Sequence, residues 1–264
     1  MGVPGYTLAP GACAGFRPGT LDRHETVFID PGHGGLDPGT GGTTSNGDTI
    51  VEKDLALQVS MKLRDDLLNL GYTVVMSRTT DSQVTAIGPS DVEDGFLTED
   101  AGHRDAAARV ACANASRAKA LLSVHFNGFD DPTIGGAETY FDADRDFSSE
   151  NTRLAALVQQ ALMNAFQAGG WPVPDRGILP DDGAGTAYSA EATSYGHLFV
   201  LGPAQSGWND APSTMPGALA EPLFITRPTE GDVAASSQGQ AAIASGLAAG
   251  LQQFLHGAPA PQSP

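Results

Sequence analysis

Residues 26–35 read Thr-Val-Phe-Ile-Asp-Pro-Gly-His-Gly-Gly, a short apolar run that ends at a turn and is followed by a histidine. An apolar run stopped by Pro-Gly is typical of a buried strand. Similar runs follow at residues 72–76, 120–124 and 137–141, and a last strand is expected within residues 217–225.

Between these runs, apolar residues recur every three or four positions, which is the pattern of an amphipathic helix. The expected helices cover residues 55–70, 103–115, 154–166 and 243–254. Residues 171–214 are rich in proline, glycine and aspartate and are expected to form mostly loops. Strands that alternate with helices of this length predict an α/β fold, with a single domain and a mixed, mostly parallel sheet flanked by helices.

Composition limits the classes of function. The chain has 264 residues, 41% of them hydrophobic, which suits one domain with a real core. No stretch approaches the roughly 18 consecutive apolar residues that a membrane span needs, so we expect no span. With 14 basic and 31 acidic residues the net charge is −17. Phosphate backbones repel such a chain, so we do not expect it to bind nucleic acid.

Cys13 and Cys112 are the two cysteines of the chain. Two cysteines alone cannot build a disulfide framework or a zinc–thiolate site. Two interpretations stay open, namely one bridge that ties the N-terminal segment to a helix, or a free thiol in the core at Cys112. Residues 1–20 lack the basic region followed by an apolar run that marks an export signal.

Two histidines lie where strands of the expected sheet end. His33 comes after the first strand and its turn, and His125 directly follows the strand at residues 120–124. Functional groups of α/β folds gather at the carboxyl ends of strands, so we expect the two imidazoles to lie close together. An imidazole pair needs one or two further ligands to bind zinc, and a catalytic site keeps one position open for water. Either histidine alone would be an ordinary hydrogen-bonded loop residue.

Glu52 is the candidate for a third ligand, because it lies just before the first expected helix. A glutamate at such a position also simply favours a helix N-terminus. Asp54, two residues later, is a credible N-cap for the same helix. Position alone therefore does not decide between a metal ligand and a helix-stabilising residue.

Taken together, these pieces resemble the zinc-dependent N-acetylmuramoyl-L-alanine amidases, the cell-wall hydrolases often called amidase type 3. The resemblance covers about residues 25–255 and implies one zinc ion per chain, held by His33, Glu52 and His125. It also implies an amidase catalytic domain at residues 24–256, between an N-terminal tail at 1–23 and a disordered C-terminal tail at 257–264. The matching segments are residues 28–35, 51–54, Arg78, 109–114, 123–128 and 136–140.

The family also carries a catalytic glutamate in a segment that resembles Pro-x-x-Leu-x-Glu. Residues 216–221 fit this pattern, so the resemblance implies that Glu221 is the general base. The chain then departs from the family, because Pro222 stands where a small or apolar residue is usual and removes a backbone donor. Two other interpretations stay open: Glu221 is an exposed strand-end residue, or another carboxylate, such as that of Glu138, is the general base.

Several other residues have weaker assignments. Glu138 and Asn127 are candidates for substrate binding. Asp30 is expected to shape its turn and to accept a hydrogen bond from the second nitrogen of a ligating imidazole. Arg78 and Arg109 are expected to be structural partners of acidic residues. The remaining histidines, His24, His103, His197 and His256, have no convincing partner in the sequence and are expected to be structural.

The resemblance implies that the substrate is peptidoglycan and that the bond joins N-acetylmuramic acid to L-alanine of the stem peptide. We expect a monomer that is extracellular or associated with the cell wall, although the chain shows no export signal. Two alternatives stay open. Two histidines and a glutamate also serve a zinc peptidase that cuts elsewhere in the stem peptide, and a catalytically silent peptidoglycan-binding regulator would retain the same fold.

Overall fold

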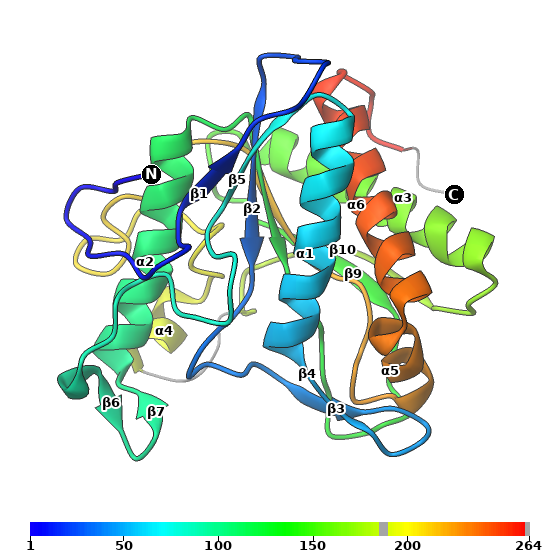
Figure 1. Ribbon diagram of the computed structural model, residues 1–264, viewed down its shortest axis with the longest axis horizontal. Coiled ribbons are helices and arrows are strands. Elements are labelled where there is room, and N and C mark those ends of the chain that lie inside the picture. The colour runs from blue at the N-terminus through cyan, green and yellow to red at the C-terminus, as the bar shows by residue number, and fades with distance from the viewer. Residues whose placement is uncertain (185–189, 262–264) are drawn as a thin grey trace.

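The structure is a computed structural model that describes residues 1–184 and 190–261. A seven-stranded sheet runs through the centre of the molecule, with helices on both faces (Figure 1). Four of its six strand pairings are parallel, which confirms the mixed, mostly parallel sheet. In spatial order its strands are β1 (Ala14–Phe16), β5 (Thr73–Met76), β2 (Thr26–Pro31), β8 (Ala120–Val124), β11 (Gly217–Glu221), β9 (Ala137–Phe141) and β10 (Asp175–Pro180).

The helices divide between the two faces of the sheet. Helix α6 contacts both α1 and α3, and Figure 1 shows these three on one face with α2 on the other. Two short hairpins, β3–β4 (Gly41–Thr43, Thr49–Val51) and β6–β7 (Val92–Glu93, Phe96–Leu97), lie toward the end to which β2 points. The helices are α1 (Glu52–Asn69), α2 (Glu99–Ser116), α3 (Ser148–Gly169), α4 (Ala190–Tyr195), α5 (Pro228–Ala235) and α6 (Ser237–Leu255).

Alternation along the central strands builds two hydrophobic cores. Val27 and Ile29 of β2 are buried against the side of α1, α3 and α6, whereas Phe28 between them is buried with residues of α2. The same alternation occurs in β8, where Leu122 faces the first core and Leu121 the second. A strand buried on both faces reads as a continuous apolar run, which is why these strands were predictable from the sequence.

The register of the parallel strands brings the candidate residues to one end of the sheet. Pro31 of β2 lies opposite Val124 of β8, and Val124 lies opposite Ala220 of β11. His125 and Glu221 each follow these residues by one position, so they extend from neighbouring strands at the same level and on the same face.

Two edge strands differ from the sequence prediction. The expected tail at residues 1–23 contains β1, which pairs antiparallel with β5, and the expected loop region contains β10, which pairs with β9. A disulfide joins Cys13 to Cys112 of α2, so the bridge was the right alternative and the free thiol was wrong. Edge strands bury less apolar surface, so their patterns are weak. The boundaries of the catalytic domain stay a prediction.

Candidate metal centre and active site

The turn after β2 has a backbone that few sequences accept. His33, Gly34 and Gly35 all have positive φ angles, 58°, 129° and 56°. A side chain on Gly32 would collide with the imidazole of His125, so glycine is needed for the two histidines to approach. Positive φ at a non-glycine residue stores strain, and such strain is common at functional sites.

Two buried arginines donate hydrogen bonds to the backbone of this turn. Arg109 donates from Nη2 to the carbonyl of His33 at 2.6 Å, and Arg78 donates from Nη2 to the carbonyl of Gly32 at 2.7 Å. Arg109 also forms ion pairs with Asp30 and Asp105, at 2.9 and 3.0 Å, which confirms its expected structural role. These contacts fix the backbone from which His33 projects.

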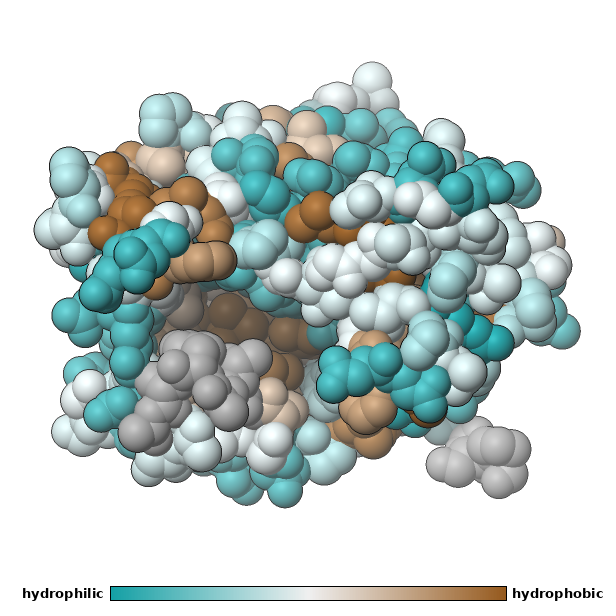
Figure 2. Space-filling model, turned by 90° about the horizontal axis from the view of Figure 1, so that it is seen from below, coloured by the Kyte–Doolittle hydropathy of each residue, from teal (hydrophilic) through white to brown (hydrophobic). Residues whose placement is uncertain are grey.

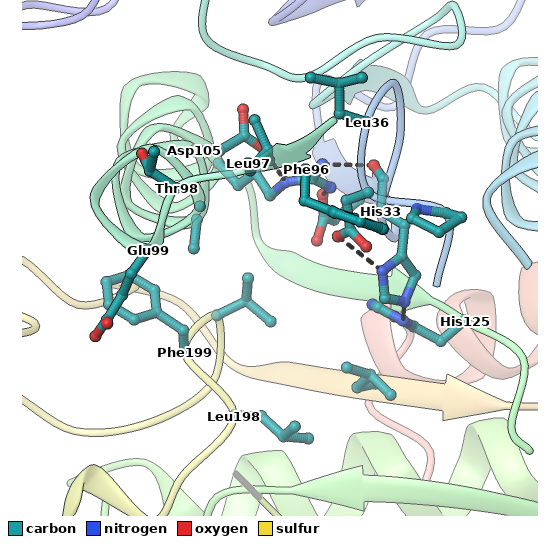
Figure 3. Close-up of a pocket in the computed structure, with 18 residues that line it drawn as sticks. His33, Leu36, Phe96, Leu97, Thr98, Glu99, Asp105, His125, Leu198 and Phe199 are labelled. Atoms are coloured by element: carbon teal, nitrogen blue, oxygen red, sulfur yellow. Dashed lines mark hydrogen bonds and ion pairs between the residues drawn. The ribbon is translucent and has the colours of Figure 1, made fainter. Parts of the chain in front are cut away.

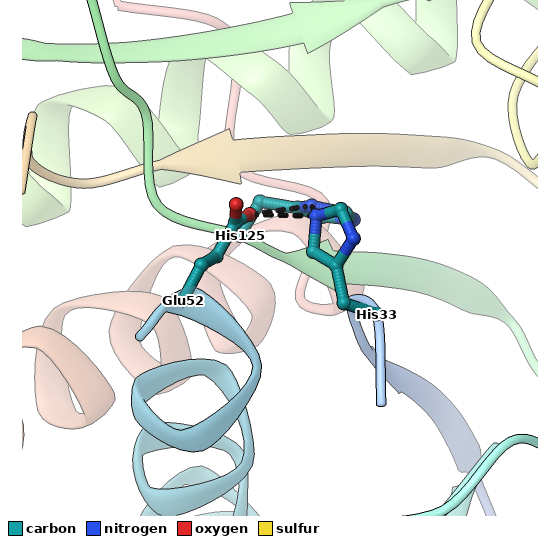
Figure 4. A group of neighbouring side chains, drawn as sticks. All are labelled: His33, Glu52 and His125. Carbon is teal, nitrogen blue, oxygen red and sulfur yellow. Dashed lines mark hydrogen bonds and ion pairs between the residues drawn. The ribbon is translucent and has the colours of Figure 1, made fainter. Parts of the chain in front are cut away.

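Three potential ligand atoms converge beside the turn (Figure 4). Oε1 of Glu52 lies 2.9 Å from Nε2 of His33 and 3.0 Å from Nδ1 of His125, and these two nitrogens are 3.1 Å apart. Ligand atoms of a tetrahedral zinc ion, each about 2.1 Å from the metal, lie about 3.4 Å from one another. The spacing and the donor set of two imidazoles and one carboxylate therefore fit zinc.

Backbone amides orient Glu52, which is the first residue of α1 rather than the residue before it. Its Oε2 accepts a hydrogen bond from the amide of Thr40 at 2.7 Å, and its Oε1 accepts one from the amide of Phe126 at 3.0 Å. The N-cap is Val51, without a side-chain bond, so the expectation that Asp54 caps this helix was wrong.

Asp37 supports the metal-facing orientation of His33. Nδ1 of His33 donates to Oδ2 of Asp37 at 2.8 Å, which directs Nε2 toward Glu52 and His125. We expected Asp30 in this role, but its carboxylate instead accepts hydrogen bonds from Ser77 and Ser123 and pairs with Arg109. The sequence carries one signal for Asp37, its position four residues after His33 in a glycine-rich loop.

The electrostatics of the cluster favour a cation. Burial alone would lower the pKa of His33, but hydrogen bonds to Asp37 and Glu52 outweigh it and raise the pKa to about 10. Burial would raise the pKa of Glu52, yet the hydrogen bonds from His125 and His33 bring it well below its usual range. The carboxylates of Asp37 and Glu52 thus favour positive charge at the cluster formed by His33, Glu52 and His125.

Glu221 and Glu138 face each other across β11 and β9 but have different surroundings. Oε2 of Glu221 is buried and has no hydrogen-bond partner within the described part of the chain. Burial first, and then the charge of Glu52, raise the pKa of Glu221 well above its usual range. Glu221 is therefore a half-buried residue whose carboxyl group has one buried oxygen without a hydrogen-bond partner.

In Glu138, by contrast, both carboxylate oxygens have partners. Its Oε1 accepts hydrogen bonds from Nδ2 of Asn127 at 2.7 Å and from the hydroxyl of Tyr140 at 2.8 Å. Its Oε2 pairs with the guanidinium of Arg176. The sequence indicated neither Tyr140 nor Arg176 as a partner.

A cavity of about 420 Å³ opens beside His33 and His125 and has largely apolar walls. His33 and His125 lie at one end of it, with Phe96 above them and Phe199 and Leu198 on the opposite wall (Figure 3). Figure 2 views this end of the molecule and shows a hollow with apolar residues in its depth. The cavity therefore opens the imidazoles of His33 and His125 to solvent.

Comparisons with known proteins identify the family of the chain. The family model of N-acetylmuramoyl-L-alanine amidase matches residues 27–253. YqiI of Bacillus subtilis is 31% identical over 231 residues, which cover 87% of this chain and 84% of that protein. The germination-specific N-acetylmuramoyl-L-alanine amidase of the same organism is 25% identical over 229 residues, which cover 87% of this chain and 79% of that protein.

A solved structure supports the same assignment. The N-acetylmuramoyl-L-alanine amidase from Clostridium difficile 630 aligns with a TM-score of 0.62 and 28% identity, covering 88% of this chain and 97% of that one. The match includes the single domain with a mixed sheet between helices. The chain therefore belongs to the amidase type 3 family of N-acetylmuramoyl-L-alanine amidases.

Proposed function

We propose that the chain is a zinc-dependent hydrolase that cleaves the amide bond between N-acetylmuramic acid and L-alanine of the peptidoglycan stem peptide. The observation that carries the proposal is the convergence of three potential ligand atoms about 3 Å apart, next to Glu221, whose Oε2 is buried without a hydrogen-bond partner. The family supplies the identity of the bond.

In this proposal His33, Glu52 and His125 would hold one zinc ion. Zinc bound there would lower the pKa of a water molecule to about 7 and polarise the amide carbonyl. Asp37 and the amides of Thr40 and Phe126 keep the ligand side chains in place, so little reorganisation is needed when the ion binds.

Glu221 is the proposed general base and acid. Its free oxygen accepts a proton from the attacking water as the new carbon–oxygen bond forms. Glu221 then returns the proton to the nitrogen of L-alanine as the carbon–nitrogen bond breaks. The products are a carboxylate on the lactyl group and a stem peptide with a free amino group. Burial, and then the charge of Glu52, raise the pKa of Glu221, which makes its carboxylate a stronger proton acceptor than an exposed glutamate.

Glu138 and Asn127 are the proposed substrate-binding residues. Their hydrogen bond to each other and the contact of Glu138 with Arg176 make Glu138 a poor base, because its oxygens already accept three hydrogen bonds. The same contacts suit a rigid surface that positions a substrate.

We further propose that the protein acts as a monomer outside the cytoplasm, on or near the cell wall. The Cys13–Cys112 disulfide supports this location, because disulfides persist in oxidising compartments. No helix among residues 1–184 and 190–261 is long and apolar enough to cross a membrane.

Digestion of purified muropeptides followed by mass analysis tests this function. We expect free stem peptides that begin with L-alanine and glycans that carry an unsubstituted lactyl group. Shorter peptides with the L-alanine still attached to the glycan would indicate a zinc peptidase instead. Absence of any product from zinc-loaded protein would indicate a silent peptidoglycan-binding regulator.

A further inference from the structure

A second group of potential metal ligands lies beyond the ends of β9 and of the edge strand β10. Asp142 directly follows β9 and Asp181 directly follows β10. These strands are parallel neighbours, with Phe141 opposite Pro180, so the two aspartates emerge side by side. His197, which follows α4, completes the group, and none of these residues is a ligand of the first centre.

The two carboxylates present one oxygen each to the same ring nitrogen. Nδ1 of His197 lies 3.1 Å from Oδ2 of Asp142 and 3.2 Å from Oδ1 of Asp181. The other oxygen of each carboxylate is held by a backbone amide. Oδ1 of Asp142 accepts from the amide of Asp144 at 2.8 Å, and Oδ2 of Asp181 accepts from the amide of Leu198 at 3.0 Å. Both side chains are thus fixed with their free oxygens toward one point.

This group contains two carboxylates but only one imidazole, so its charges do not balance. The side chains of Asp142 and Asp181 are 0% and 1% exposed, and a single Nδ1–H can satisfy only one of the two facing oxygens. Oδ2 of Asp142 is buried without a hydrogen bond. The nearby guanidinium of Arg145 donates instead to the carbonyls of Leu201 and Gly202 and to Ser213. A buried carboxylate oxygen without a partner is costly, and a cation at this point would remove the cost.

We propose that Asp142, Asp181 and His197 bind a second divalent metal ion, and that this ion is zinc. One imidazole and two carboxylates suit zinc, because calcium and magnesium prefer all-oxygen sites. The separations of 3.1 and 3.2 Å are close to the roughly 3.4 Å between ligand atoms of tetrahedral zinc. The chain then holds two zinc ions, one more than the family resemblance implies.

The second ion has a structural role that reaches the active-site cavity. It joins the ends of β9 and β10 to His197, and the residues after His197 form one wall of that cavity, namely Leu198, Phe199 and Val200. Leu198 is also tied directly to Asp181 through its amide. The ion therefore fixes the position of this wall and takes no part in the proposed hydrolysis.

Metal analysis of the full chain tests the second site. After saturation with zinc and removal of the excess, we expect two zinc ions per wild-type chain by plasma mass spectrometry. We expect one in Asp142→Asn, one in His197→Gln, one in His125→Ala, and none in Asp142→Asn combined with His125→Ala. Asp144→Asn is the matched control and should keep two zinc ions. It removes one carboxylate charge, as Asp142→Asn does, but Asp144 is exposed and its carboxylate lies 3.8 Å from Nε2 of His197.

Two outcomes would overturn the second site: two zinc ions in Asp142→Asn, or a single zinc ion in the wild type that is lost in His125→Ala. A diffraction measurement on wild-type crystals at the zinc edge avoids the risk that a variant fails to fold. We expect an anomalous peak between Asp142, Asp181 and His197, and its absence at saturating zinc would refute the proposal. Loss of the peak at His33 and His125 alone would contradict the proposed function but leave the second site intact.

Discussion

The Cys13–Cys112 disulfide makes a large and measurable contribution to stability, which removal of both cysteines should reveal. The bond closes a loop of 99 residues between the strand-forming N-terminal segment and α2. In the chain-entropy treatment, a loop of about 100 residues restricts the unfolded state by about 4.7 kcal/mol. A chain of this size loses about 2 °C of melting temperature per kcal/mol, so the expected decrease is about 9 °C.

The assay is thermal unfolding of the Cys13→Ala, Cys112→Ala double variant beside the oxidised and the reduced wild type. Alanine avoids the burial of a hydroxyl at two fully buried positions. Reduced wild type and double variant should melt at the same lower temperature. A decrease below about 3 °C would refute the reasoning, because it would mean that β1, with three residue pairs to β5, detaches before the domain unfolds.

Three further substitutions test the active site. Glu221→Gln should reduce turnover of muropeptides by about two to four orders of magnitude with zinc content unchanged. Near wild-type turnover in Glu221→Gln, together with loss of turnover in Glu138→Gln, would contradict the assignment of Glu221 as the general base. Asp37→Asn should weaken zinc binding by about 10- to 100-fold in competition with a chelator, whereas Asp22→Asn, which removes a similar contact to the exposed His24, should not. Gly32→Ala should displace the ring of His125 and reduce zinc content, whereas Gly41→Ala, with open space around its Cβ, should retain it.

The sequence predicted the central strands because each is buried on both faces and forms a continuous apolar run, as Val27 to Ile29 and Ala120 to Val124 do. It did not predict β1 or β10, because each is an edge strand whose residues are largely exposed or half-buried. Pairing with a neighbour, rather than local pattern, creates these two strands.

The residues of the candidate site likewise fall into those that the sequence predicted and those that it did not. His33 and His125 were predictable as neighbours because both lie at the ends of parallel strands. Asp37 was not, since its role depends on a turn with positive φ at His33, and Asp30 was expected in its place. His197 was expected to be only structural, because its partners Asp142 and Asp181 are distant in sequence and meet through the pairing of β9 with β10.

The most direct test of the proposed function is digestion of muropeptides by the zinc-loaded protein in water enriched in heavy oxygen, with mass analysis of both products. Hydrolysis of the proposed bond places one heavy oxygen on the lactyl carboxylate of the glycan and none on the released stem peptide. We predict this labelling for the wild type and only trace product for Glu221→Gln. Heavy oxygen in a new carboxylate of the peptide, with L-alanine still attached to the glycan, would contradict the proposed amidase activity.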